Sequence, residues 1–341
     1  SPEVWQQIKD SIQALEVLTG KKFGGVDNPL IVSVRSGAPK SMPGMLETIL
    51  NIGISNKTLE TKSLPKEAIS HLYDAYGRLI QMFARVIYQV DLGIKKDRFN
   101  ANDVALLLVN FSKFTPTTFP QDPYEQLKQA VSAVFDSWLA PKAVAYRKEF
   151  KIPDEWGTAA IIQCLVFGNM GSDSGTGVVF SRNPTSGGRE LFGEYLLDAQ
   201  GEDLVAGIRT PKPIVDLRKD IPAAYQSLMG ICEKLEIIFQ DIQDIEFTIE
   251  SGKLWILQTR SAKRAPLATI KIAVDLVSEE FITKEDAIQR IEPKIISQVL
   301  SSRFNDVAEK DALAAGIPSS PGAAVGKVAL SREKVLEFLS A

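Results

Sequence analysis

The residues best suited to chemistry lie in residues 244–260, DIEFTIESGKLWILQTR. Acids alternate there with apolar residues, and Ser251-Gly252 marks a turn, so the stretch predicts a β-hairpin. Carboxylate and amide oxygens are ligands for magnesium bound to a nucleotide, and an arginine beside them neutralises a transferring phosphoryl group. The alternative is a solvated hairpin face that carries a surface salt bridge.

The register of this hairpin decides whether those side chains meet. A two-residue loop pairs Glu250 with Lys253 and turns Gln258 toward the apolar face. A three-residue loop, residues 251–253, separates polar from apolar residues better, and we adopt it although turn statistics favour the first. The adopted pairs are Glu250 with Leu254, Glu246 with Gln258, and Asp244 with Arg260. The apolar face is then formed by Ile245, Phe247, Ile249, Trp255 and Leu257.

A second candidate site lies in residues 31–53, IVSVRSGAPKSMPGMLETILNIG. The pattern predicts a buried strand that ends at Arg35, a loop of small residues at 36–44, and a helix beyond Gly44. Backbone in such a loop can approach a ligand closely, and arginine suits phosphate. The alternative is an ordinary strand-loop-helix connection with a surface arginine.

A glycine-rich run, GNMGSDSGTGVVFSRNP, occupies residues 168–184 and follows an apolar stretch at 158–167 typical of a central strand. A solvated hairpin loop is the default interpretation of the run. As a second small-residue loop with an arginine, Arg182, it favours phosphate binding.

Composition narrows the class of protein. The chain has 341 residues, 45% of them hydrophobic, and a net charge of -3, which fits two or three globular domains and argues against nucleic-acid and membrane-surface partners. The sequence contains no apolar run of membrane-spanning length, and we expect no signal peptide. Cys164 and Cys232 lie in apolar patterns, so we expect buried thiols and a cytoplasmic, reduced setting. The chain opens with Ser1-Pro2, so the native N-terminus is expected to be missing.

The single histidine, His71, lies on a strongly amphipathic helix predicted at residues 65–91. We expect a surface or packing role for it, which excludes histidine-based triads and most histidine-rich metal sites. Residues 63–150 are mostly helical by pattern and separate two strand-rich regions.

These motifs together resemble the N-terminal nucleotide-binding region of the pyruvate phosphate dikinase family. The matching stretches are SVRSGAPKSMPGM (33–45), FPQDPYEQL (119–127), IPDEWGTA (152–159), VFGNMGSDSGTGVVFSRNP (166–184), FGEYLLDAQGEDLVAGIRTP (192–211) and residues 244–260. They follow the family's order and cover most of residues 20–262. The resemblance implies an α+β class and an ATP-grasp fold, with ATP between two α+β subdomains and an inserted helical subdomain.

The resemblance also implies roles for individual residues. ATP-binding positions map onto Arg35, Gly44, Gln163, Val166, Glu246, Gln258 and Arg260. Glu246 and Gln258 are the expected Mg2+ ligands, with the Asp244 carboxyl group as a third candidate ligand nearby. Arg35 and Arg260 are the expected catalytic residues, and the strand at 163–167 is expected to contact adenine.

The resemblance also implies an order of domains. Residues 1–55 would form the first part of the ATP-grasp fold, 56–150 the helical insert, and 151–263 the remainder of the fold with the metal-binding hairpin. Residues 264–310 would form a helical linker, and 311–341 the start of a truncated phosphohistidine domain.

The resemblance implies a reaction as well. The family interconverts ATP, phosphate and pyruvate with AMP, pyrophosphate and phosphoenolpyruvate, through a histidine on a swivelling domain. We expect that histidine to follow this chain and an ATP-binding lysine segment to precede it. Implied partners are ATP, phosphate, the phosphohistidine domain of the same full-length chain and, in the full-length protein, a second copy.

Two alternatives remain open from the sequence. A water dikinase or an antibiotic phosphotransferase would share the hairpin but matches SMPGM and FPQDPYEQL less well. A non-catalytic nucleotide-binding module would keep the fold without phosphoryl transfer, although loss of Arg35 or Arg260 would be expected there, and both are present.

Overall fold

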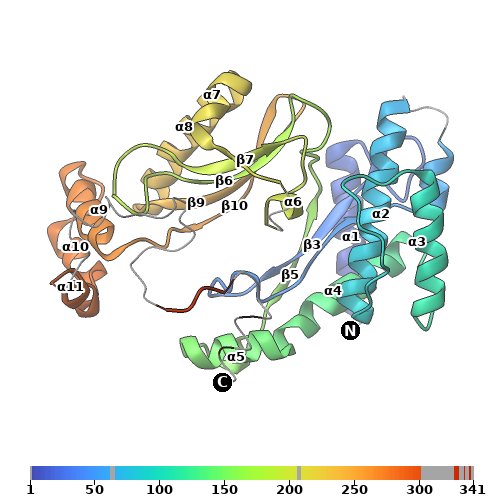
Figure 1. Cartoon of the computed structure of the whole chain (residues 1–341), viewed down its shortest axis with the longest axis horizontal. Coiled ribbons are helices and arrows are strands. Elements are labelled where there is room, and N and C mark those ends of the chain that lie inside the picture. Colours follow the sequence, from blue (N-terminus) through green and yellow to red (C-terminus); the bar gives the residue numbers. More distant parts are fainter. Residues whose placement is uncertain are drawn as a thin grey trace. The chain divides into compact units, whose positions relative to one another are not determined.

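The computed structural model describes residues 2–61, 66–205, 209–300 and 326–329, together with Lys334 and Phe338. The chain divides into two compact units, Ser1–Phe167 and Gly168–Ala341, each with its own sheet and core (Figure 1). The main sheet of each unit is antiparallel, which confirms the predicted mixture of helices and sheets. No helix in the described ranges is long and apolar enough to cross a membrane.

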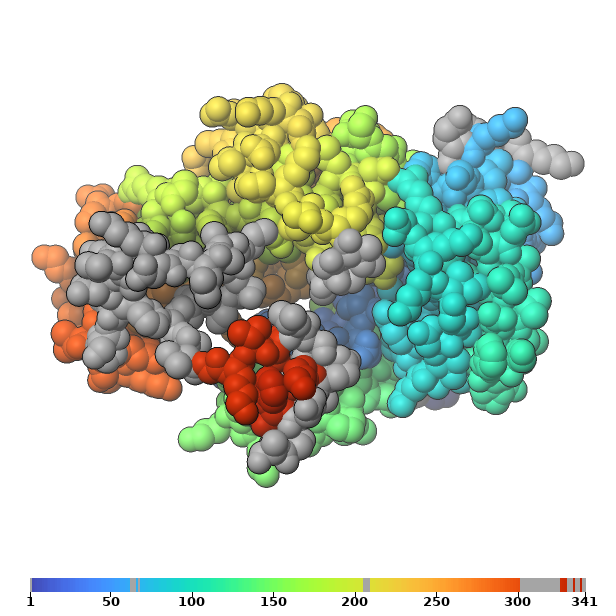
Figure 2. Space-filling model, viewed as in Figure 1, coloured from blue at the N-terminus to red at the C-terminus, as the bar shows by residue number. Residues whose placement is uncertain are grey.

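The first unit is built on a three-stranded sheet in the order β4-β3-β5. Its elements are α1 (Pro2–Thr19), β1 (Lys22–Phe23), β2 (Pro29–Leu30), β3 (Val32–Gly37), β4 (Thr48–Ile52), η1 (Asn56–Glu60), α2 (Lys66–Tyr88), α3 (Ala101–Phe114), α4 (Pro123–Asp136), η2 (Ser137–Leu139), α5 (Pro141–Phe150), η3 (Asp154–Trp156) and β5 (Ala159–Cys164). Helices α2 and α4 pack against the sheet. Helices α2 and α3 lie side by side, and their atoms form a continuous surface in the space-filling view (Figure 2).

Two local predictions in this unit were wrong. The residues beyond Gly44 do not start a helix but lead into β4, which pairs with β3 and buries Ile49 and Ile52. β-branched residues pack well on a pleated sheet, and this packing outweighs the helical spacing of the pattern. The strand β5, predicted to be central, is one of the two edge strands among the described strands of this sheet.

The second unit is built on a five-stranded sheet in the order β10-β9-β6-β7-β8. Its elements are β6 (Gly175–Phe180), β7 (Phe192–Leu197), α6 (Gly201–Val205), β8 (Lys212–Pro213), η4 (Ile214–Asp216), α7 (Leu217–Asp220), α8 (Pro222–Phe239), β9 (Gln243–Glu250), β10 (Lys253–Ser261), α9 (Pro266–Ser278), α10 (Lys284–Arg290) and α11 (Pro293–Leu300). Helix α8 packs on β9 and β10 (Figure 1).

The core of the second unit lies on one face of its sheet. Val179, Tyr195, Ile245, Phe247 and Ile249 are buried there together with Leu228 and Cys232 of α8. A Cβ added at Gly177 would lie 2.4 Å from the Phe247 ring, so a glycine is required for that ring to fit. Burial raises the pKa of the Cys232 thiol to about 12, in agreement with the predicted buried thiol, whereas Cys164, also predicted to be buried, is only half-buried.

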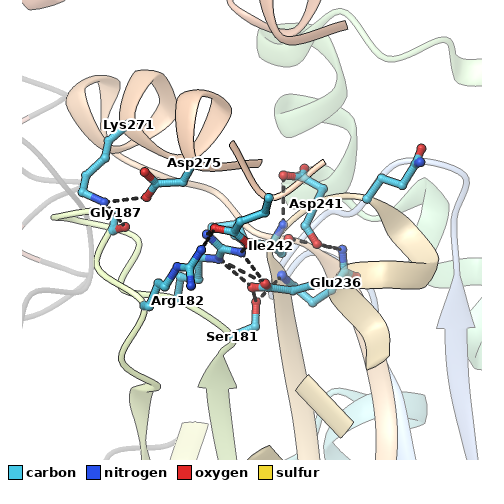
Figure 3. A network of polar contacts seen from close by, with 12 residues as sticks. Ser181, Arg182, Gly187, Glu236, Asp241, Ile242, Lys271 and Asp275 are labelled. Atoms are coloured by element: carbon cyan, nitrogen blue, oxygen red, sulfur yellow. Dashed lines mark hydrogen bonds and ion pairs between the residues drawn. The ribbon is translucent and has the colours of Figure 1, made fainter. Parts of the chain in front are cut away.

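A buried ion-pair network joins the end of β6 to α8 and to the end of α9 (Figure 3). Arg182 Nη2 donates to Glu236 Oε2 at 2.8 Å and to Glu279 Oε2 at 2.6 Å, and Ser181 Oγ donates to Glu236 Oε1 at 2.5 Å. Burial alone would lower the pKa of Arg182, but the hydrogen bonds to Glu279 and Glu236 outweigh it and raise the pKa. The guanidinium group of Arg182 therefore donates its hydrogen bonds to two carboxylates, and it is not available to bind a phosphate.

The second carboxylate of this network gives stability that depends on pH. Hydrogen bonds from Arg182 hold the pKa of Glu279 below its usual value of 4.5, and Arg189 adds to this effect. A carboxylate with a lowered folded-state pKa stabilises the fold at higher pH, and this stabilisation is lost as the pH falls through that pKa.

We therefore expect Glu279→Gln to destabilise the chain clearly at about pH 6 and much less at about pH 3.5. Urea unfolding at both pH values measures this difference. The matched control is Glu280→Gln, since Glu280 is its exposed neighbour, and it should show no such pH dependence. A Glu279→Gln effect equal at both pH values would contradict the prediction.

Candidate functional site

The β9–β10 hairpin combines both registers that the sequence allows. Near the turn Glu250 pairs with Lys253, and the two loop residues, Ser251 and Gly252, have φ angles of 49° and 75°. The loop therefore has two residues, as expected when both positions adopt positive φ, and the predicted pairing of Glu250 with Leu254 is wrong.

A β-bulge at Leu257 then shifts the register by one residue. Beyond it Glu246 pairs with Gln258 and Asp244 pairs with Arg260, as predicted. The bulge turns Gln258 to the polar face, which the two-residue loop alone would have prevented.

The two-residue loop also changes the predicted apolar face near the turn. Trp255 pairs with Thr248, is 38% exposed, and has Lys253 Nζ over its ring at 3.9 Å from the centroid. Ile256 instead lies opposite Phe247 and packs on the core. The prediction was wrong at Trp255 because it applied one register to the whole hairpin.

Asp244 and Arg260 form an ion pair at the open end of this hairpin. Arg260 Nε donates to Asp244 Oδ2 at 2.7 Å, and Nη1 lies 3.8 Å from Glu246 Oε1. Asp244 is 9% exposed, and its Oδ1 has no hydrogen-bond partner. Burial raises the pKa of Asp244 in spite of Arg260. A buried carboxylate oxygen without a partner marks a place where a cation or a water fits.

The sheet register adds one carboxylate that the sequence did not indicate. Val178 of β6 pairs with Glu246 on one side and with Glu194 of β7 on the other. Directly paired residues point to the same face of a sheet, so Glu194, Glu246 and Gln258 lie on one face. No group of three His, Cys, Asp or Glu residues in the described part of the chain could hold a metal ion, so an amide or ligand oxygens would have to complete a metal site here.

The other candidate residues lie in the first unit. Arg35 pairs with Thr48 and Ile161, and Gln163 pairs with Ser33, so Arg35 and Gln163 share one face of the β3–β5 pair. Both are half-buried, as is Val166, which follows β5. Gly44 is exposed and has a φ of 71°, which a residue with a side chain would adopt only with strain.

His71 is half-buried within α2 of the first unit. This placement agrees with the predicted surface or packing role.

A family model described as pyruvate phosphate dikinase, AMP/ATP-binding domain, matches residues 1–222 and 221–280. The chain belongs to this family. It is 46% identical over 348 residues to the pyruvate, phosphate dikinase of Clostridium symbiosum, covering 96% of this chain and 40% of that protein. The Entamoeba histolytica protein of the same name is 44% identical, covering 97% of this chain and 40% of its own length. The chloroplastic protein of Mesembryanthemum crystallinum is 41% identical, covering 98% and 37%.

The chain thus spans about 40% of the length of the pyruvate, phosphate dikinases that it matches. The predicted linker is described as far as Leu300 and contains α9, α10 and α11. The predicted phosphohistidine-domain segment, residues 311–341, lies outside the described residues except for residues 326–329, Lys334 and Phe338.

Proposed function

We propose that this chain is the Mg-ATP-binding part of a pyruvate phosphate dikinase and has an ATP-grasp fold of two subdomains with a helical insert. The observation that carries the proposal is the bulge at Leu257, which gathers Glu246, Gln258, Asp244 and Arg260 at one end of a hairpin. Two carboxylates and an amide offer oxygen ligands, and phosphate oxygens and waters can complete an octahedral magnesium site.

In this proposal some side chains of the hairpin bind the metal ion, and another stabilises the charge of the phosphoryl group. Glu246 and Gln258 would hold the metal, and the unpartnered Oδ1 of Asp244 offers a third oxygen. Magnesium, when bound, neutralises charge on the phosphates and orients them. Arg260, fixed by its hydrogen bond to Asp244, would stabilise phosphoryl charge.

The first unit would contribute Arg35 as a second phosphate-binding cation and the loop around Gly44 as backbone donors. Residues 163–167, with Gln163 and Val166, would contact adenine. The described arrangement supports these roles through the shared face of Arg35 and Gln163.

For the whole protein we propose phosphoryl transfer from ATP to a histidine on a separate domain, with phosphate and pyruvate as further substrates. A homodimer and a cytoplasmic setting of the full-length protein stay predictions.

A water dikinase is the second candidate function, and an assay of the full-length protein separates it from the pyruvate phosphate dikinase. AMP formation that requires both phosphate and pyruvate supports the dikinase, whereas AMP formation without phosphate contradicts it.

The metal role predicts the behaviour of Glu246→Gln. Loss of the carboxylate charge should weaken Mg-ATP binding by about tenfold or more, because an amide is a poorer ligand for a hard cation, while the fold is hardly affected. Calorimetric titration of the chain with Mg-ATP measures the affinity. Glu250→Gln is the matched control, since Glu250 lies on the same strand at the turn and pairs with Lys253. Equal affinity of Glu246→Gln and the unsubstituted chain would contradict the proposal.

A further inference from the structure

The loop that joins β3 to β4 rests on a small core of its own. This loop-support cluster consists of buried Met42, Trp138, Ala143 and Ile152, with Ala38, Met45, Leu46 and Tyr146 packed against them. It is separate from the main core of the first unit. Met42 is 6% exposed, whereas Pro39, Lys40, Ser41, Pro43 and Gly44 are exposed. One side chain in the middle of an exposed loop is therefore inserted into a core.

The cluster is held together by a buried arginine that the proposed function does not use. Arg147 is 2% exposed, its Nη1 donates to Trp138 O at 2.5 Å, and its guanidinium lies 4.2 Å from the centre of the Trp138 ring. Arg147 Nε donates to Asp154 Oδ1 at 2.7 Å, and Trp138 Nε1 donates to Asp154 O at 3.0 Å. These contacts tie α5 and η3 to the tryptophan under the loop.

Both ends of the loop are also fixed. Gly37 N donates to Thr158 Oγ1 at 3.1 Å where β3 ends. Glu47 N donates to Ser137 Oγ at 3.2 Å just before β4 begins. With Met42 inserted between these two anchors, the exposed backbone around Gly44 is held at three points.

We propose that Met42, Trp138 and Arg147 are positioning residues that set the shape of the loop before the nucleotide binds. This inference rests on the proposed function, in which the backbone around Gly44 binds phosphate. A loop that already has its binding conformation loses less conformational entropy when the ligand binds. The positioning residues therefore increase the affinity of the loop for the nucleotide without contacting the nucleotide themselves. Met42 is the link, because it belongs to both the loop and the cluster.

The first test needs no nucleotide. In the full chain, Met42→Ala should raise the amide hydrogen-exchange rates of residues 38–47 by about tenfold. Leu107→Ala is the matched control, since Leu107 is fully buried in the main core of the same unit and is not part of the cluster. It should lower overall stability without raising exchange in the loop selectively. Unchanged exchange of the loop in Met42→Ala would overturn the inference.

The second test measures Mg-ATP affinity by calorimetry at a temperature where every variant is folded. Met42→Ala should bind about tenfold more weakly, Met42→Leu should restore most of the affinity because it keeps the volume, and Leu107→Ala should bind as the unsubstituted chain does. Arg147→Lys, which keeps the charge but loses the planar fork, should weaken binding in the same direction. Faster loop exchange with unchanged affinity in Met42→Ala would overturn the positioning role. An unsubstituted chain that does not bind Mg-ATP would instead overturn the proposed function.

Discussion

Replacing Arg182 by methionine is expected to lower the free energy of unfolding by about 3–5 kcal/mol, because it leaves the buried Glu236 without its cation and Glu279 with only the exposed Arg189. The side chains of Glu236 and Glu279 are 9% and 15% exposed, so water cannot fully replace the lost partner. The substitution also separates the end of β6 from α8 and α9, which Arg182 joins (Figure 3). Urea unfolding of the full chain at neutral pH measures the change.

The matched control for this prediction is Arg189→Met. Arg189 also pairs with Glu279, but its side chain is 67% exposed, so its loss should cost less than about 1 kcal/mol. The difference between the two variants isolates the effect of burial from the effect of charge. Similar small effects for both arginines would show that Arg182 does not hold these elements together.

Arg260→Ala is expected to reduce Mg-ATP affinity, or the phosphoryl-transfer rate of the intact enzyme, by about 2–4 kcal/mol. The physical reason is that Asp244 and Glu246 orient a fixed cation beside the proposed metal ligands. Without that cation, phosphate charge is unbalanced and Asp244 loses its hydrogen-bond donor. Arg35→Ala is expected to act in the same direction from the first unit. Calorimetry on the chain and a dikinase assay on the full-length protein give the two readouts.

Arg264→Ala is the matched control for Arg260→Ala. Arg264 forms two hydrogen bonds with Asp241, at 2.6 and 2.7 Å, and its exposure is similar to that of Arg260. Its loss removes an ion pair of comparable quality from the same unit, so it controls for destabilisation alone. Full nucleotide affinity and full activity in Arg260→Ala would mean that this arginine is a surface residue.

The pairing of Glu246 with Gln258 was predictable from the sequence, but the reason given for it was wrong. Alternation of polar and apolar residues required these two side chains on one face, and this requirement is satisfied in the structure. The prediction obtained the pairing from a three-residue loop. The protein obtains it from a two-residue loop followed by a bulge, and no local residue pattern marks the bulge at Leu257.

Long-range partners could not be predicted in the same way. Arg182 finds Glu236 and Glu279, which lie 54 and 97 positions away. Glu194 lies on the same face of the sheet as Glu246 because β6 lies between β7 and β9. That strand order cannot be read from local sequence patterns. The small-residue loop around Arg182 therefore resembled a phosphate site locally, whereas its arginine serves packing.

The bulge at Leu257 also determines which changes in length the hairpin tolerates. Leu257 is one residue more than a regular ladder needs, so deleting it would leave Ile256 opposite Phe247 and Gln258 opposite Glu246, with Arg260 still opposite Asp244. Deleting two residues between Gly252 and Gln258 would instead place Gln258 opposite Phe247, on the apolar face, and every later side chain of β10 would change faces with it. The hairpin should therefore tolerate the loss of one residue in this segment but not the loss of two.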